Sequence, residues 1–109
     1  MKKEYLGRWR IVEMEMWDKH YIDMEVPGYI LFEENNSGEF QFGLVRGYMD
    51  CRVEPYADTE RVEFTWEGSD EMDPVSGRGW ARINEDGRLE GMIYFHEGDD
   101  SGFIAERNV

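Results

Sequence analysis

Cysteine, positive charge and long apolar runs are scarce in this sequence. Cys51 is the only cysteine among the 109 residues, so no intramolecular disulfide can form, and this usage is typical of a reducing compartment. No stretch approaches the roughly 18 consecutive apolar residues of a membrane-spanning helix. Lys2 and Lys3 are not followed by the apolar run of a secretory signal. We therefore expect a cytoplasmic protein.

Positive charge is the second scarcity. Lysine and arginine number 12 against 25 aspartates and glutamates, which gives a formal net charge of −13. Proteins that bind nucleic acids gather lysine and arginine to neutralise phosphates, whereas the basic residues here are scattered along the chain. The same argument applies to anionic membrane surfaces. The sequence therefore predicts neither a nucleic-acid partner nor a membrane partner.

Motifs for catalysis, metal binding and cofactor binding are also missing. His20 and His96 are the only histidines, and neither belongs to a Ser-His-Asp spacing or a nucleophile elbow. The acidic segment 70–73 lacks the spacing of an EF-hand loop, and a single cysteine cannot form a zinc cluster. Gly77 and Gly79 lack the spacing of a phosphate-binding loop. We predict no catalytic residue, no metal and no cofactor.

Aromatic residues, by contrast, are abundant. They make up 15% of the chain and hydrophobic residues 40%, which is enough for a folded core despite the charge. A length of 109 residues is typical of one domain, and no linker or repeat divides the chain. We predict a single domain over residues 1–109.

Short segments of alternating polar and apolar residues, separated by turn residues, indicate β-strands. The clearest is 61–67, in which every even position is apolar. A switch of apolar parity at Ile11–Val12 predicts a β-bulge in the first strand. Helical spacing predicts a short helix within 17–24, and polar residues predict a loop over 68–75. The predicted strands are 9–16, 29–33, 39–45, 48–54, 61–67, 77–83, 89–95 and 102–107.

Connections between these strands are short, so strands that are neighbours in sequence are expected to pair antiparallel. An open meander of eight strands would leave two exposed edges, and closure removes both. We predict an all-β, eight-stranded antiparallel up-and-down barrel. The short helical segment between its first and second strands would cover one end of the barrel.

The segment Gly7-Arg8-Trp9 at the start of the first strand resembles the G-x-W motif of the lipocalins and related calycins. The resemblance implies a barrel whose closed end is covered by Trp9, packed against an arginine near the end of the last strand. Arg107 is the matching arginine. The short chain looks more like intracellular members of this superfamily. Segments 17–24 and 70–80 look like those of small bacterial proteins with no assigned function.

A small barrel of eight strands can hold one small ligand or be filled by its own side chains. The leading hypothesis is a non-enzymatic binding protein that takes a small amphipathic molecule at the open barrel end. Rings would contact its apolar part, and an inward-pointing arginine would clamp a carboxylate or phosphate. The expected ligand-binding residues are Trp17, Tyr21, Tyr29, Phe42, Trp66, Arg78 and Trp80.

The alternative is a protein-interaction or homodimeric assembly module with a barrel filled by its own aromatic rings. The arginines would then lie on the outer face and pair across strands with glutamates such as Glu63 and Glu90. An apolar outer patch would mark the interface. Its expected members are Ile30, Phe32, Met92, Tyr94 and Ile104.

Overall fold

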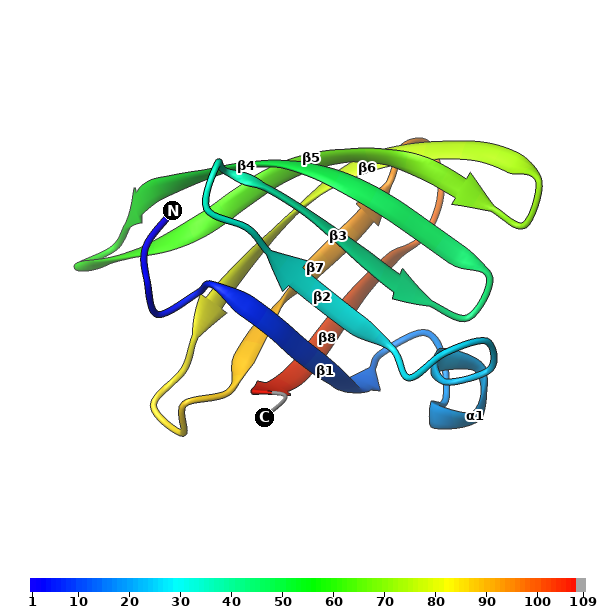
Figure 1. Ribbon diagram of the computed structural model, residues 1–109, viewed down its shortest axis with the longest axis horizontal. Coiled ribbons are helices and arrows are strands. Elements are labelled where there is room, and N and C mark those ends of the chain that lie inside the picture. Colours follow the sequence, from blue (N-terminus) through cyan, green and yellow to red (C-terminus); the bar gives the residue numbers. More distant parts are fainter. Residues whose placement is uncertain (108–109) are drawn as a thin grey trace.

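Eight antiparallel strands close into a barrel in which sequence neighbours pair and β8 returns to β1 (Figure 1). This computed structural model describes residues 1–107. The predicted all-β class, the up-and-down order and the short helix between the first two strands are confirmed. The elements are β1 (Gly7–Met14), α1 (Lys19–Ile22), β2 (Tyr29–Phe32), β3 (Ser37–Phe42), β4 (Val45–Tyr56), β5 (Thr59–Asp70), β6 (Asp73–Ile83), β7 (Leu89–Phe95) and β8 (Asp100–Arg107).

The polar segment 68–75 is not the loop that its composition predicted. β5 and β6 continue through it and pair as far as Asp70 and Asp73, which leaves Glu71 and Met72 as a two-residue turn. Glu71 adopts a positive φ of 60° in this turn. No residue of the segment is buried. Val75 is the residue of this segment that packs against the core, so no run of alternating apolar residues marks the hairpin in the sequence.

The turn between β3 and β4 lies at Gly43 and Leu44, before the gap between the predicted strands 39–45 and 48–54, which contains Gly47. Gly43 adopts the left-handed conformation that this turn requires, with φ of 56°. Gly47 instead lies inside β4, opposite Phe40 of β3. Because Gly47 has no side chain, it leaves room for the rings of Phe40 and Trp66, and it takes no part in the turn.

β4, β5 and β6 are the longest strands, and their hairpins extend past the neighbouring strands at the two ends of the barrel (Figure 1). The N–H of Cys51 donates to the carbonyl of Asn36, just before β3, and the carbonyl of Ser76 accepts from the N–H of His96, just after β7. Backbone groups two residues apart in a strand point to the same side, so the backbone of Pro55 faces the side of β4 beyond the end of β3. The backbone of Pro74 likewise faces the side of β6 beyond the end of β7. Proline has no N–H to donate, which disfavours pairing with a strand of another molecule.

Aromatic rings fill the barrel interior, and glycines on neighbouring strands make room for them. Phe40 lies over Gly47, where an added Cβ would come within 2.5 Å of Phe40 Cζ and 2.9 Å of Trp66 Cε3. At Gly91 the same Cβ would come within 2.9 Å of Phe103 Cε1. Each of these rings therefore occupies the volume that a neighbouring side chain would otherwise need.

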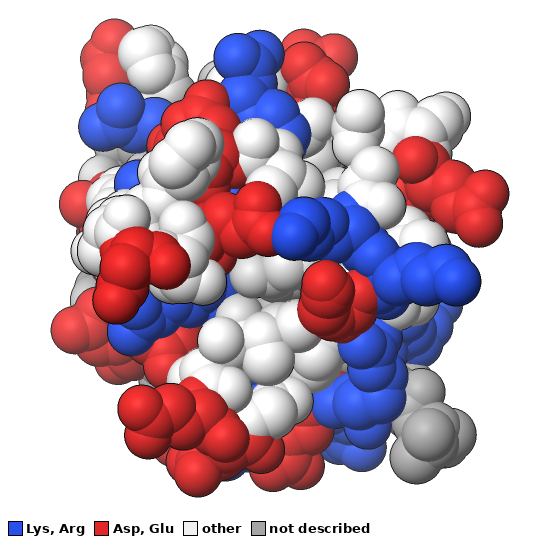
Figure 2. All heavy atoms as spheres, turned by 90° about the vertical axis from the view of Figure 1, so that its left-hand side faces the viewer, with Lys and Arg blue, Asp and Glu red and all other residues white. Residues whose placement is uncertain are grey.

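One end of the barrel is covered by Trp9, which is 1% exposed. Its Nε1–H donates to the carbonyl of Tyr5 (3.0 Å), and the guanidinium of Arg107 lies 4.0 Å from its ring centroid. Arg107 also donates to the carbonyls of Glu4 and Leu6. The Trp9–Arg107 contact implied by the resemblance is therefore present. Figure 2 looks onto this end and shows acidic and basic side chains interspersed around uncharged surface.

The opposite end is covered by the segment between β1 and β2. Asp18 caps α1 by accepting a hydrogen bond from the N–H of Tyr21 (3.0 Å). Trp17 packs against the inward-facing Phe42, with ring centroids 5.0 Å apart, and Ile22 is fully buried. Within residues 1–107 no helix is long and apolar enough to span a membrane.

The bulge predicted at Ile11–Val12 is confirmed, since the register of β1 against β8 shifts between Ile11 and Glu13. The prediction that Ile30 and Phe32 belong to an outer patch is wrong. Both point into the barrel and are 0% and 1% exposed. All four residues of β2 are apolar, so alternation along this strand cannot tell its inner face from its outer face.

Candidate functional site

The seven predicted ligand-binding residues lie in three separate places. Phe42 and Trp66 point into the barrel and are 0% and 3% exposed. Trp17 and Tyr21 stack on each other at the end covered by α1, with ring centroids 6.1 Å apart. The remaining three, on the outer face, are Tyr29, Arg78 and Trp80. The seven residues therefore do not line one common pocket.

Rings occupy the path from the α1 end into the barrel. Phe42 follows Trp17 inward, Phe40 lies 5.9 Å from Phe42, and Trp66 lies 5.0 Å from Phe40, measured between ring centroids. Phe95 closes the group against Trp66 at 5.1 Å. A molecule entering from this end would first displace Trp17 and then the rings beneath it.

The expectation that Arg78 points inward is wrong, and Trp80, also counted among the pocket-lining rings, points outward with it. In the middle of β6 the inward positions are Gly77 and Gly79, which lie beneath Trp66 and Phe64, and Ala81, which is fully buried. Because glycine has no apolar side chain, the pattern of apolar residues in β6 does not reveal that Gly77 and Gly79 face the core. Arg82 pairs with Glu90 (3.4 Å) on the outer face, as the alternative hypothesis expects of the arginines. Arg78 points to the same outer face.

Tyr29 is an outer-face residue that is nevertheless only 8% exposed. The guanidinium of Arg8 lies over its ring, 4.0 Å from the centroid, and its hydroxyl donates to Glu39 Oε2 (2.6 Å). Burial, together with this hydrogen bond to a carboxylate, raises the pKa of Tyr29. Tyr29 is therefore held by its own neighbours and is separate from Arg78 and Trp80.

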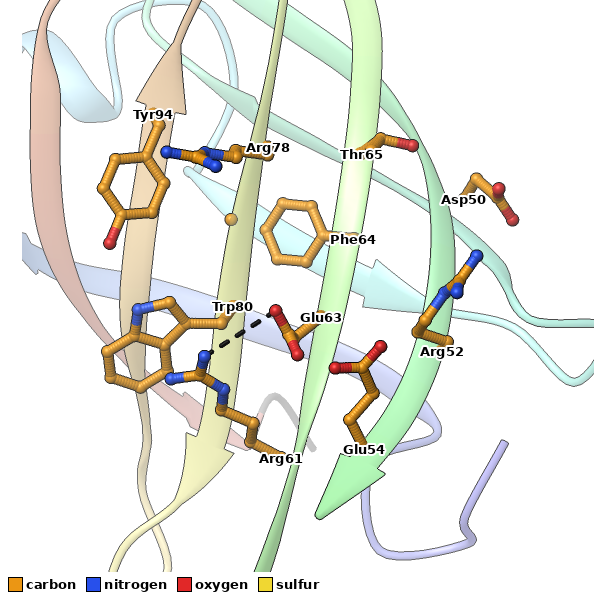
Figure 3. Close-up of a pocket in the computed structure, with 11 residues that line it drawn as sticks. Asp50, Arg52, Glu54, Arg61, Glu63, Phe64, Thr65, Arg78, Trp80 and Tyr94 are labelled. Carbon is orange, nitrogen blue, oxygen red and sulfur yellow. Dashed lines mark ion pairs between the residues drawn. The ribbon is translucent and has the colours of Figure 1, made fainter. Parts of the chain in front are cut away.

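The outer face of β4–β7 carries a groove of about 450 Å³ (Figure 3). Arg78 and Trp80 stand on β6 at one side of it, with Tyr94 of β7 beyond them, and Arg52 of β4 stands opposite. The exposed threonine Thr65 lies between them on β5. The lining residues are Asp50, Arg52, Glu54, Arg61, Glu63, Phe64, Thr65, Arg78, Gly79, Trp80 and Tyr94.

Guanidinium groups of arginines lie over aromatic rings in and beside this groove. The guanidinium of Arg61 lies 4.3 Å from the centroid of Tyr56 and 5.0 Å from that of Trp80. The two rings are themselves stacked, with centroids 6.5 Å apart and planes 18° apart. Arg78 lies 5.3 Å from the centroid of Tyr94. Cation–π contacts of this kind orient a guanidinium and leave its N–H groups available for other partners.

Two arginines of the groove have no acidic partner in the part of the chain that the structure describes. Within residues 1–107, no carboxylate lies within 4.0 Å of the guanidinium of Arg52 or Arg78. This is notable in a chain in which acidic residues outnumber basic ones by 25 to 12. Arg61, by contrast, pairs with Glu63 at 3.6 Å. The groove thus holds an exposed arginine, Arg78, that is oriented by a ring and not neutralised by a neighbour.

Two carboxyl groups meet at the other side of the groove. A hydrogen bond with Glu63 raises the pKa of Glu54, because a proton shared between two carboxyls is held more tightly than one on an isolated carboxyl. Both residues are on the wet face that the alternation of 61–67 and 48–54 predicts. The sequence offered no signal that they approach each other across β4 and β5, since this depends on the register.

The lining of the groove combines charged, aromatic and hydroxyl side chains. Cys51 lies on the inner face of β4, away from this lining: it is 4% exposed, and burial raises its pKa to about 12. Sequence reasoning singled out Arg78 and Trp80 and missed Arg52, Arg61 and Tyr56. The two arginines were visible only as polar positions of strands, and Tyr56 only as a turn residue.

Comparisons with protein-family models, with curated proteins and with solved structures gave no match. The protein is therefore described by its fold and its groove: it is a closed antiparallel barrel with a charged and aromatic groove on its outer face.

Proposed function

We propose that this protein is a non-enzymatic binding module that takes a small amphipathic anion in the outer groove. The observation that carries the proposal is Arg78, an exposed guanidinium oriented by Tyr94, free of carboxylates in the described chain and next to the ring of Trp80. A carboxylate, phosphate or sulfonate would accept hydrogen bonds from Arg78. The apolar part of the same molecule would contact Trp80.

The barrel interior supports placing the ligand outside. Both ends are covered, one by Trp9 and the other by Trp17, and the rings between them pack at ordinary contact distances. A ligand could enter the groove without displacing a ring, because Arg78 and Thr65 are already exposed. A volume of about 450 Å³ lies within the usual range of small-molecule sites.

Two fluorescent probes test this proposal. Anilinonaphthalene sulfonate is an aromatic anion, and N-phenylnaphthylamine is its uncharged counterpart. We expect the Arg78→Gln variant to bind the sulfonate about tenfold more weakly, because a charge-assisted hydrogen bond is lost. Binding of the uncharged probe should change less than about twofold.

Arg88→Gln is the matched control. It removes the same charge from an exposed ion pair with Glu106 (3.4 Å) outside the groove. Circular dichroism of each variant checks that the fold is retained. If Arg88→Gln weakens sulfonate binding as much as Arg78→Gln does, the probe responds to net charge and the proposed site is wrong.

We further propose a distant relation to the lipocalin-like calycins. It is supported by the Gly7-Arg8-Trp9 segment and by the contact between Trp9 and Arg107 at 4.0 Å. On this relation, the chain keeps the barrel and its closed end while its own rings occupy the interior.

A second candidate function is self-association through what remains of the predicted outer patch. Met92, Tyr94 and Ile104 do point outward and are partly exposed, and a hollow of about 340 Å³ lies beside Met92 and Ile104. Size-exclusion chromatography with light scattering gives the oligomeric state directly. A dimer that Met92→Glu converts to a monomer would support this candidate, and a monomer at high protein concentration would refute it.

A further inference from the structure

The groove at Arg78 continues along β6 toward the β5–β6 turn. A second hollow of about 480 Å³ shares Thr65, Arg78 and Tyr94 with the first, and a third of about 520 Å³ shares Ser76 with the second. We call these three hollows together the furrow. From Trp80 to Ser76, β6 advances four residues, which corresponds to about 13 Å in a strand. The furrow is therefore long enough for a linear ligand.

Strand pairing arranges the furrow in cross-strand rows. Successive outward residues of β5 and β6 are two positions apart, so neighbouring rows are separated by about 6.6 Å. The rows are Glu63–Trp80, Thr65–Arg78 and Glu67–Ser76.

The chemistry of the furrow changes from row to row. The first row offers the ring of Trp80, since Glu63 is paired with Arg61. The second row offers the guanidinium of Arg78. The third row offers the exposed carboxylate of Glu67, which makes no ion pair with any residue of the described chain. Along β6 the order of binding surfaces is thus apolar, cationic and anionic.

Glu67 is the carboxylate that lines the third hollow, and its neighbours there include Tyr48 and Ser76. Glu97 and Asp100 line the second hollow together with Arg78. No lysine or arginine lines the third hollow. A cationic group is therefore the complementary partner there.

We propose that the furrow binds an extended peptide segment whose apolar, acidic and basic side chains stand at every second position. This inference rests on the proposed function, because the acidic side chain would occupy the anion site at Arg78. An extended peptide turns alternate side chains to one face at the same spacing as the rows of β6. The hydroxyls of Thr65 and Ser76, exposed in the middle of the furrow, would bond to its backbone.

Isothermal titration calorimetry with capped pentapeptides tests the order of the rows. The first peptide carries phenylalanine, aspartate and lysine at alternate positions with serine between them, and the second has the reverse sequence, since the strand direction is open. The third has the same composition with aspartate moved to one end. We expect one of the first two peptides to bind at least about tenfold more tightly than the third.

Glu67→Gln and Arg78→Gln separate the two sites within the furrow. Glu67→Gln should weaken the preferred peptide about threefold to fivefold and leave binding of anilinonaphthalene sulfonate unchanged, whereas Arg78→Gln should weaken both. Glu85→Gln, an exposed residue of the β6–β7 turn, is the control for the loss of one negative charge.

The outcomes distinguish the two proposals. If the ordered and rearranged peptides bind equally, or none binds, while the sulfonate still responds to Arg78→Gln, the peptide inference is wrong and the anion site stands. If the sulfonate also fails to respond, both proposals are wrong. A preferred peptide that loses affinity in both variants, with Glu85→Gln unchanged, supports the order of the rows.

Discussion

The two faces of β5 and β6 use aromatic rings in opposite ways. On the inner face, the ring of Phe64 lies over Gly79, and Trp66 lies near Gly77, so that each ring fills the space of a missing side chain. On the outer face, Trp80 of β6 lies beneath the guanidinium of Arg61 of β5, and Tyr94 of the neighbouring β7 lies beneath that of Arg78. The same two strands therefore carry rings paired with glycine inside and rings paired with arginine outside.

The difference separates what stabilises the fold from what is free to bind. An inner ring contributes its full burial and cannot move without leaving a cavity. An outer cation–π contact at an exposed site contributes only about 0.5–1 kcal/mol, so a ligand can replace or share it at little cost. Stability therefore comes mainly from the inner face of these strands, and the proposed binding site lies on the outer face.

The largest expected effect comes from removing an inner ring. Phe40 is fully buried, and Tyr48, a ring of similar size on the outer face of β4, is 52% exposed. Phe40→Ala should lower the free energy of unfolding by about 3–5 kcal/mol, and Tyr48→Ala by less than about 1 kcal/mol. Urea unfolding of both variants measures the difference. Equal losses would contradict the division between the two faces.

Cys51 reports how well the inner face excludes solvent. Burial, with Asp50 adding a smaller contribution, raises the pKa of its thiol from 9.0 to about 12. At pH 8 the thiolate fraction is then about a thousandfold lower than in the unfolded chain, and alkylation by iodoacetamide should slow at least in proportion. Because the folded pKa is raised, the stability linked to this thiol is present below pH 9 and is lost as the pH rises toward 12.

The alkylation rate in urea provides the control for this prediction. It should rise to that of a free thiol across the same unfolding transition that circular dichroism detects. Rapid alkylation of the native protein at pH 8 would show that the inner face of β4 opens without unfolding, and the two faces would then differ less than the structure indicates.

A smaller effect is expected from filling the space that a glycine leaves for a ring. Gly47→Val places methyl groups where Phe40 and Trp66 already lie, and should destabilise the protein by about 1–3 kcal/mol. Gly102→Ala is the matched control, because the nearest atom to its added Cβ is 3.5 Å away on Met92. Thermal unfolding of the two variants compares them. Equal stability would mean that Phe40 relaxes at no cost.

The fold could be predicted from the sequence wherever one face of a strand is buried and the other is wet. Segment 61–67 shows this alternation and lies within β5, and 89–95 coincides with β7. The rule fails where both faces share one character. β2 is apolar on both faces, so its pattern does not show that Ile30 and Phe32 face inward, and the hairpin over 68–75 is mostly polar, so its composition predicts a loop.

The groove could be predicted only in part for a related reason. Gly77 and Gly79 flank Arg78, and Trp80 follows, which makes this segment stand out in the sequence, but the same glycines conceal the inner face of β6 and reverse the expected direction of Arg78. Arg61 and Tyr56 join the site through the register of β4, β5 and β6. Pairing between strands is a property of the whole barrel, and no local pattern in either strand contains it.

The smallest expected effect lies in the contact between Tyr56 and Arg61. Tyr56 is 40% exposed, and the guanidinium of Arg61 lies 4.3 Å from its ring centroid. A double-mutant cycle with Tyr56→Ala and Arg61→Gln should give a coupling energy of about 0.5–1 kcal/mol, as exposed cation–π pairs do. A cycle on the exposed Arg88–Glu106 ion pair should give less than about 0.5 kcal/mol. A coupling energy above about 2 kcal/mol at Tyr56–Arg61 would mean that outer rings also hold the barrel together, and the groove would then be a structural feature as much as a binding surface.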